Sequence, residues 1–150
     1  MISIKTVAQY IIKLCSDDPQ GISNMKLQKL CYFTQAWYLA EHHKPLFSDD
    51  FEAWIYGPVS RLLYNHYRHF GKDPITIKPD SREISLLSHD EKAFIKKIFH
   101  KYGKFSAIEL MVESHKDPAW TNARNGVSPN AQCSHLISKE EMEKSYADQV

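Results

Sequence analysis

The stretch KLQKLCYFTQAWYLAEHHKPLFSDDFEAWIYGPV, which spans residues 26–59, decides the fold of this chain. Apolar side chains lie on almost every side of the helix that its first part predicts, a pattern typical of a helix at the centre of a core. Ser23 can cap the start of this helix, and Pro45 ends it, since the residue before a proline is driven out of helical geometry. The aromatic segment 51–56 then has the character of a short strand.

Capping residues and helical spacing predict one helix before this stretch and another at its end. The first begins after Ser3 and ends at the turn formers around Asp17. The other opens at Gly57 and Pro58, because a proline at the first helical position loses no hydrogen bond and its fixed φ suits a helix start. It ends at Gly71. Its expected buried stripe consists of Val59, Leu62, Leu63, His66, Tyr67 and Phe70.

The second half of the chain predicts a series of short helices. Three S-x-x-E capping boxes mark helix starts at Ser88, Ser106 and Ser138, and Asp117 before a proline marks one more. Residues 72–87 carry two short β-like runs around a turn, so we predict a small hairpin there. Together these patterns predict a mainly α fold in a single domain over residues 1–150. We expect a compact bundle of about six helices around the central aromatic-rich helix, with short extended segments or a small β-hairpin.

The composition favours an ordinary globular protein and argues against several classes. Hydrophobic residues make up 43% and charged residues 25% of the 150 residues, which suffices for a core without disulfides or metal. The net charge of +1 gives no strong field for nucleic acid or for an anionic membrane. The three cysteines, Cys15, Cys31 and Cys133, are odd in number and far apart, which indicates free thiols. With no apparent signal peptide and no apolar run long enough to cross a membrane, we expect a cytoplasmic protein.

A histidine pair offers one hypothesis for chemistry. His66 and His69 stand three residues apart on the predicted third helix, a spacing that can chelate a metal ion if His100 or His115 supplies a third ligand. No HExxH or CxxC motif supports such a site. Because His66 falls on the expected apolar stripe, a hydrogen-bonded core histidine is the more frequent outcome, and we predict no metal.

A cysteine nucleophile is the second hypothesis. Cys133 has His135 two residues on, but this proximity without a framing motif is weak evidence for a catalytic pair. Cys31 lies in the most apolar helix, where a thiol has a raised pKa and low reactivity. The sequence also has no glycine-rich phosphate-binding loop. We therefore predict no catalytic residue and no cofactor, and a protein that is not an enzyme.

A basic and aromatic stripe is the clearest binding feature outside the expected core. Arg61, Tyr64 and Arg68 are spaced by three and four residues, so they can share one face of the third helix. Arg and Tyr are frequent anchors of both protein interfaces and RNA contacts. The nearly balanced charge favours a protein partner over nucleic acid.

Residues 26–59 resemble the signature of the Panacea domain, also called the SocA-like antitoxin domain. The family pattern runs K-L-Q-K-L-x-Y-[FY]-x-[QH]-[AG]-x-x-L, then K-P-L-F, then F-x-A-W-x-[YH]-G-P-V. The chain matches it at Lys26, Leu27, Gln28, Lys29, Leu30, Tyr32, Phe33, Gln35, Ala36 and Leu39, at residues 44–47, and at Phe51, Ala53, Trp54, Tyr56, Gly57, Pro58 and Val59. The capped helix after Ser88, the segment SHKDPAW and the last capped helix also resemble the second half of the family.

This resemblance implies an antitoxin that neutralises a cognate toxin, encoded beside it, by direct protein contact. Two alternatives stay open: an adapter that delivers the toxin to a cytoplasmic AAA+ protease, and a phage-associated interaction protein without a toxin. We expect partner contacts at Trp54, Tyr56, Gly57, Pro58, Arg61, Tyr64 and Arg68, with a purely structural role as the alternative for the Gly-Pro pair. Further candidates, expected to point off the main apolar face of the central helix, are Lys26, Gln28, Lys29 and Tyr32.

Overall fold

The structure, a computed structural model, describes all residues from 1 to 150. Its elements in chain order are α1 (Ile4–Leu14), α2 (Asn24–His42), β1 (Glu52–Trp54), β2 (Gly57–Val59), α3 (Arg61–Tyr67), the 3-10 turn η1 (Arg68–Phe70), α4 (Ser81–Ile84), α5 (His89–Tyr102), α6 (Ala107–His115), α7 (Pro118–Arg124) and α8 (Lys139–Ala147). The fold is therefore mainly α with one two-stranded antiparallel sheet, as the sequence predicts.

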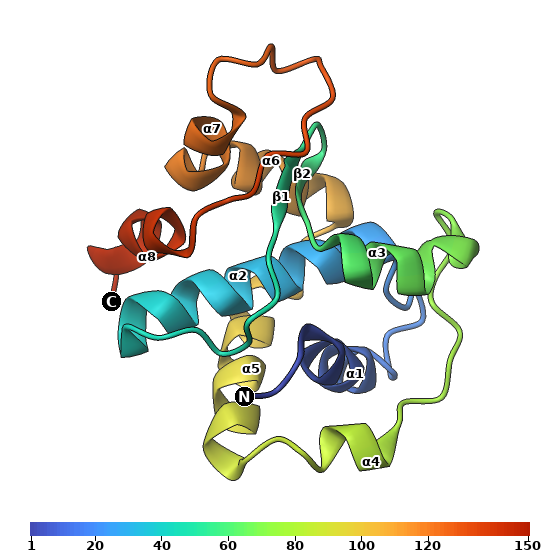
Figure 1. Ribbon diagram of the computed structural model, residues 1–150. Helices are drawn as coiled ribbons and strands as arrows, with labels where there is room; N and C mark the ends of the chain where they lie inside the picture. Colours follow the sequence, from blue (N-terminus) through green and yellow to red (C-terminus); the bar gives the residue numbers. More distant parts are fainter.

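Helix α2 runs through the middle of the molecule and contacts α1, α3, α5, α6, α8 and β2 (Figure 1). Both of its ends follow the local sequence. The Ser23 hydroxyl accepts a hydrogen bond from the Lys26 N–H at 3.2 Å, and His43 closes the helix in the left-handed conformation with φ of 58°. Side chains are buried on nearly every side of α2. The prediction of a central core helix that stops before Pro45 is confirmed.

The buried polar residues of α2 bind the main chain of segments that pass beside it. Gln35 Oε1 accepts from the Leu46 N–H at 2.8 Å, while Gln35 Nε2 donates to the Phe47 carbonyl at 2.6 Å. Two turns earlier, Gln28 Oε1 accepts from the Ser60 N–H at 2.8 Å and Gln28 Nε2 donates to the Ser60 carbonyl at 3.3 Å. Each glutamine thus replaces the strand partner that these extended segments would otherwise lack.

A buried carboxylate, Asp117, joins the C-terminal half to α2. Its Oδ2 accepts from the hydroxyls of Tyr32 at 2.6 Å and Tyr146 at 3.3 Å, and its Oδ1 accepts from the Ser145 hydroxyl at 2.5 Å. The same Oδ1 caps α7 by accepting from the Ala119 N–H at 2.9 Å. Because a buried carboxylate is costly unless it is well bonded, these donors make Asp117 a fixed junction of α2, α7 and α8.

The sheet is a small hairpin whose second edge is also occupied. In β1 and β2, Glu52 pairs with Val59 and Trp54 with Gly57. The outer edge of β1 bonds to the segment before α8, where the Ala53 N–H donates to the His135 carbonyl at 2.8 Å. This long-range pairing covers an edge that would otherwise be open to another chain.

The hairpin corrects one prediction about the third helix. Gly57 and Pro58 belong to strand β2, and α3 begins only at Arg61, with Ser60 as its cap. Gly57 has φ of 101°, which no helix start allows, and the Ser60 hydroxyl accepts from the Leu63 N–H at 3.3 Å. The expected stripe is also partly wrong, because Leu62 and His66 on α3 are exposed to solvent.

The hairpin predicted within residues 72–87 is wrong as well. This segment is irregular except for the single turn α4, which Asp80 caps through the N–H groups of Arg82 and Glu83. Two of the three predicted capping boxes, at Ser88 and Ser106, are complete. At Ser138 only half of the box forms, since its hydroxyl accepts from the Glu141 N–H but the Glu141 carboxylate does not accept from the Ser138 N–H in return.

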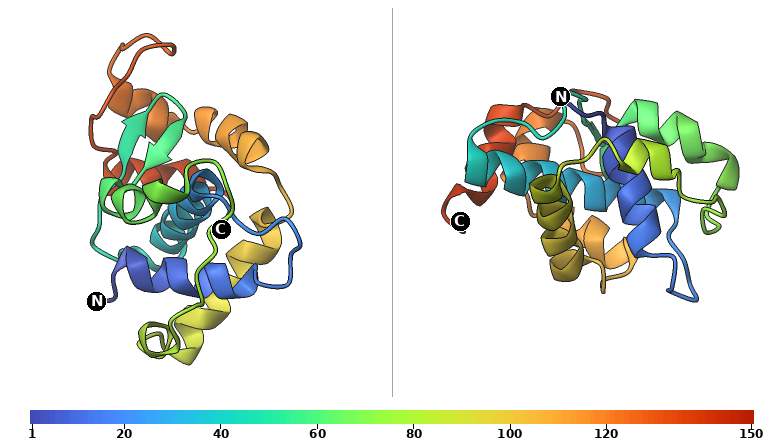
Figure 2. Two further views of the ribbon diagram at one scale, coloured as in Figure 1. Left: turned by 90° about the vertical axis from the view of Figure 1, so that its right-hand side faces the viewer. Right: turned by 90° about the horizontal axis from the view of Figure 1, so that it is seen from below.

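The two ends of the molecule differ in character. Figure 2 shows the loop between α7 and α8 projecting at one end, beside the hairpin, with α4 at the opposite end. None of the helices combines the length and the apolar character that crossing a membrane requires.

Replacing Gln35 with methionine tests the role of the buried glutamines. Gln35→Met keeps the volume but leaves the backbone groups of Leu46 and Phe47 without partners, so we expect a loss of about 3 kcal/mol in the free energy of unfolding. Urea denaturation measures it. The exposed Gln20→Met is the matched control and should change stability by less than about 0.5 kcal/mol. Equal stability of the two variants would contradict the role assigned to Gln35.

Candidate partner-binding surface

A cluster of aromatic and charged side chains covers the outer face of the hairpin and the start of α3. Glu52 is at its centre. The carboxylate accepts from Arg61 Nε at 2.9 Å, from Arg61 Nη2 at 2.8 Å and from Trp54 Nε1 at 2.9 Å. The Arg61 guanidinium also lies 5.3 Å from the centre of the Trp54 ring, and Tyr64 meets that ring edge to face at 5.0 Å. These contacts hold the four side chains in one arrangement.

Charge stabilises this arrangement. Partial burial acts to raise the pKa of Glu52, but the hydrogen bonds from Arg61 and Trp54 and the charge of Arg61 outweigh it, so the pKa lies below its usual value. The carboxylate is therefore ionised throughout the physiological pH range. A two-pronged bond between a guanidinium and a carboxylate also restricts both side chains to one geometry.

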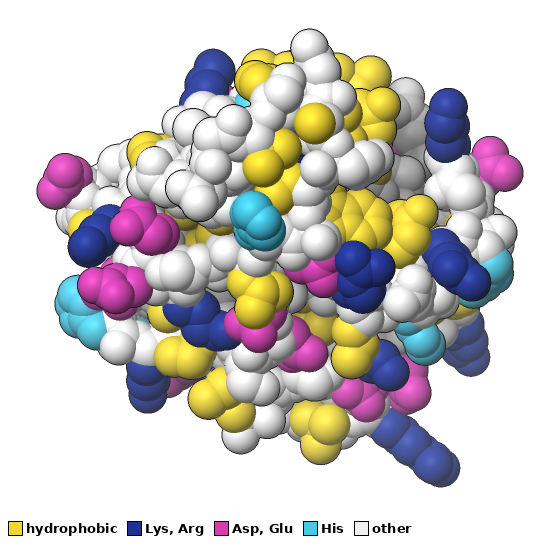
Figure 3. Space-filling view, turned by 45° about the horizontal axis from the view of Figure 1, so that its top comes forward, with side chains coloured by type: hydrophobic (Ala, Val, Ile, Leu, Met, Phe, Trp, Pro, Cys, Tyr) yellow, Lys and Arg dark blue, Asp and Glu magenta, His cyan; other side chains and the backbone are white.

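Exposed apolar side chains extend the cluster on both sides. Tyr56, in the turn of the hairpin, is 57% exposed, and Leu136, which bridges to Glu52 from the neighbouring segment, is 61% exposed. Figure 3 shows apolar side chains gathered on this end of the molecule with acidic and basic groups between them. We call the hairpin surface the set of Glu52, Trp54, Tyr56, Arg61, Tyr64 and Leu136.

The inner face of the hairpin is held by donors from two helices, α7 and α2. Arg124 Nη1 donates to the Ala53 carbonyl at 2.8 Å, and Trp120 Nε1 donates to the Trp54 carbonyl at 2.9 Å. Lys29 Nζ, from α2, donates to the carbonyl of Pro58 at 3.2 Å. The hairpin therefore cannot shift without breaking bonds to buried groups, which makes its outer face rigid.

Position 57 requires glycine because the backbone of the hairpin lies very close to the side chains of Ser114 and Lys29. A Cβ atom at Gly57 would lie 2.6 Å from the Ser114 hydroxyl and 2.8 Å from Lys29 Cε, and its φ of 101° is unfavourable for other residues. Both Gly57 and Pro58 are buried. Their positions favour the structural alternative for this pair, since neither offers a side chain to a partner.

Three basic side chains, Lys29, His115 and Arg124, lie close together beneath the turn, and burial lowers the pKa of the first two. Burial lowers the pKa of Lys29 to about 7. The pKa of His115 is lowered chiefly by burial; a hydrogen bond to the Ile55 backbone opposes this, and the charges of Lys29 and Arg124 add to it. His115 also stacks on Trp120, with ring centres 4.3 Å apart. The hairpin is thus seated on basic side chains, of which Lys29 and Arg124 donate to its backbone carbonyls.

The structure brings together only part of the predicted site. Trp54, Tyr56, Arg61 and Tyr64 form one exposed or half-buried cluster. Arg68 lies beyond α3 in η1, is exposed, and makes no side-chain bond to the cluster.

The expectation for the central helix is wrong for three of its four candidates. Gln28, Lys29 and Tyr32 are buried, since α2 is covered on all sides and their polar atoms bind the backbone or Asp117 inside the molecule. Lys26 is half-buried and donates to the Gly103 carbonyl at 2.7 Å. These signature residues build the scaffold.

Glu52 and Leu136 belong to the hairpin surface but were not predicted from the sequence. Glu52 lies between the aromatic residues of the FEAW segment and alternates with the buried Ala53, a pattern from which its outward position could have been predicted. Leu136 had no such signal, because its neighbour Glu52 is distant in sequence and joins it only through the fold.

The histidine and cysteine hypotheses find no assembled site. No group of three or more His, Cys, Asp or Glu side chains is placed to hold a metal ion, so His66 and His69 acquire no third ligand. Cys133 is buried, and the neighbouring His135 places its Nδ1 3.0 Å from the Ala123 carbonyl.

Most of the chain is similar in sequence to known antitoxin proteins. Residues 27–121 match the family model described as "Antitoxin SocA-like, Panacea domain". A curated relative, "Antitoxin SocA" of Caulobacter vibrioides (strain NA1000 / CB15N), is 27% identical over 139 residues, which cover 86% of this chain and 74% of the relative. No solved structure matches the chain.

The buried Lys29 predicts an unusual dependence of stability on pH. Its pKa is about 7 in the folded state and about 10.4 in the unfolded chain, so between these values the unfolded state binds more protons and stability rises with pH. From pH 7 to 8.5, below the range where the buried thiols respond, we expect a gain of up to about 1.4 kcal/mol per pH unit.

Lys29→Met should remove this dependence, as measured by urea denaturation at several pH values. The exposed Lys96→Met is the control and should keep the slope of the parent protein. A Lys29→Met variant with an unchanged slope would show that another group is responsible.

Proposed function

The chain belongs to the family of SocA-like antitoxins with a Panacea domain, and from this premise we propose that it neutralises a toxin protein by binding it directly. The proposed partner is a cognate toxin encoded beside it, and the proposed place of action is the cytoplasm. The hairpin surface is the proposed contact. The observation that carries this proposal is the fixed cluster of Trp54, Arg61 and Tyr64 around Glu52.

The chemistry of the hairpin surface suits a protein interface. Trp, Tyr and Arg are the residue types that carry most of the binding energy in such interfaces. Here Glu52 already orients Arg61, and Trp54 already packs on Tyr64, so a partner would not have to order them. Such preorganisation lowers the entropic cost of association.

The partner surface can be described by complementarity. Tyr56 and Leu136 offer exposed apolar area, which calls for apolar side chains on the toxin. Arg61 uses Nε and Nη2 for Glu52, and its Nη1 is left to donate to a carboxylate or carbonyl of the partner. The net charge of +1 supports a protein partner over nucleic acid.

Delivery of the toxin to a AAA+ protease is the second candidate. An adapter needs a second contact surface, and α6 offers one: Ile108 and Val112, four residues apart on this helix, are both exposed. This candidate shares the toxin contact with the first and differs in the fate of the toxin.

Co-expression with the neighbouring gene tests the proposed function. We expect the neighbour to arrest growth alone and growth to be restored when this chain is present. A neighbouring gene product that is harmless alone, or that stays toxic when this chain is present, would refute the proposed antitoxin function. The half-life of the toxin separates the two candidates, since sequestration leaves it unchanged or longer and delivery to a protease shortens it.

Substitutions on the hairpin surface test where the toxin binds. Tyr56→Ala and Arg61→Ala each remove one anchor, and we expect each to weaken toxin binding by about 2 kcal/mol, or roughly 30-fold in Kd. Calorimetry with the purified toxin measures the loss, and growth rescue should weaken in parallel.

Arg82→Ala, an exposed arginine at the opposite end, is the control and should bind as the parent protein does. All three variants should keep the parent melting temperature within a few degrees. Full affinity in both surface variants would place the interface elsewhere on the molecule.

A further inference from the structure

A concave site lies at the end of the molecule away from the hairpin. It is a pocket of about 340 Å³ between the end of α1, the segment before α4, α4 itself and the start of α5. Figure 1 places α4 at the opposite end from the hairpin. None of its lining residues belongs to the hairpin surface, so the proposed toxin contact does not account for it.

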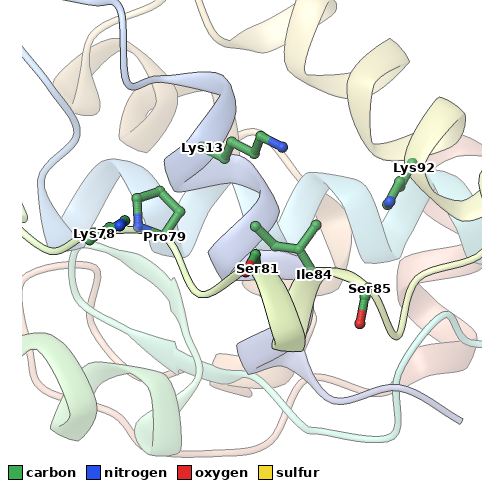
Figure 4. Close-up of a pocket in the computed structure, with 7 residues that line it drawn as sticks. All are labelled: Lys13, Lys78, Pro79, Ser81, Ile84, Ser85 and Lys92. Carbon is green, nitrogen blue, oxygen red and sulfur yellow. The ribbon is translucent and has the colours of Figure 1, made fainter.

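Three lysines from three separate elements line this pocket. Lys13 comes from the last turn of α1, Lys78 from the segment before α4 and Lys92 from α5, and Figure 4 shows Lys78 and Lys92 on opposite sides of Ile84, with Lys13 between them. The lining contains no carboxylate. None of the three ammonium groups takes part in an ion pair, so the chain itself supplies no counter-charge for them.

The acidic residues adjacent in sequence are bonded to other groups. Asp80 accepts from the N–H groups of Arg82 and Glu83 to cap α4. The Glu83 carboxylate accepts from the Thr6 hydroxyl at 2.5 Å, and that of Glu91 accepts from the Ser88 N–H at 2.8 Å. Each of these carboxylates thus has one oxygen in a capping or bridging bond, and none of them forms an ion pair with the three lysines.

The remaining lining residues suggest what kind of anion fits. Ser81 has an exposed hydroxyl with no partner in the chain, which leaves it able to donate to a ligand. Ile84 forms a buried floor, and no aromatic ring lines the pocket. Three ammonium groups and a hydroxyl match phosphate oxygens, whereas nothing is present on which a base could stack.

We propose that the pocket formed by Lys13, Lys78, Ser81 and Lys92 binds a diphosphate group, either as the free anion or as part of a larger phosphorylated molecule. Lysine binds phosphate as a point charge, and a diphosphate with about three negative charges balances three lysines. The volume lies near the lower end of ligand pockets, which are roughly 300–1,000 Å³, and leaves little space beyond the phosphates.

Calorimetric titration of the full chain with inorganic pyrophosphate and with ADP tests this proposal. At about 50 mM salt we expect saturable 1:1 binding of pyrophosphate that weakens as salt rises. Similar affinity for ADP indicates that a diphosphate within a larger molecule can enter the pocket, and binding of pyrophosphate without binding of ADP indicates the free anion as its source; both outcomes support the site. No saturable binding of either compound would overturn it, as would binding of a single-stranded oligonucleotide alone.

Matched variants locate the binding. Lys92→Gln should weaken pyrophosphate binding by about tenfold, and the double variant Lys13→Gln with Lys92→Gln should weaken it further. Lys72→Gln removes an exposed lysine outside the pocket and should change the affinity less than about twofold. An equal loss in Lys72→Gln and Lys92→Gln would show a general surface-charge effect and overturn the proposal.

A carboxylate placed in the pocket gives an independent check. Ser81 is the first residue of α4, where an acidic side chain suits the helix, so Ser81→Glu should fold normally. We expect it to abolish pyrophosphate binding while the melting temperature stays unchanged. Binding that survives in folded Ser81→Glu would show that the ligand does not occupy this pocket.

Discussion

The hydrogen bonds that buried polar side chains of α2 make to passing main-chain segments hold the rest of the structure in place. Gln35 binds the segment at Leu46 and Phe47, Gln28 binds Ser60, and Lys29 binds the Pro58 carbonyl. An irregular segment can run through the interior only if its backbone groups find partners, and α2 supplies them. The hairpin, the start of α3 and the segment at Leu46 and Phe47 all depend on these few contacts.

The same contacts explain why a rigid outer surface can exist on so short a hairpin. An isolated two-stranded hairpin is marginally stable, but here carbonyls on its inner side are bound by Lys29, Trp120 and Arg124. With the inner side fixed, Trp54 and Arg61 project outward in one geometry around Glu52. Membership of the SocA-like antitoxin family and this fixed cluster lead to the same proposal, a protein that acts by binding another protein.

Capping and periodicity are local, so they predicted most helices well, and they failed where a contact between distant residues decided the outcome. Pro58 has the chemistry of a helix start, yet pairing with Ala53 across the hairpin places it in a strand. Residues 72–87 have strand-like composition, yet no neighbouring strand is present to pair with them, and only the turn capped by Asp80 becomes regular. The aromatic half of the candidate site was predictable because it lies within ten residues, whereas Leu136 joins it from the far end of the chain.

The sequence by itself determined the central helix, its Ser23 cap and its stop before Pro45, because these depend on side chains within one turn of each other. It also determined the family, through a signature of closely spaced residues. Only the tertiary structure decided that Gln28, Lys29 and Tyr32 face inward, because a polar side chain on a helix is buried or exposed according to what packs over it. It likewise decided that Lys13, Lys78 and Lys92 share one pocket, since charges far apart in the chain meet only when the helices that carry them pack together.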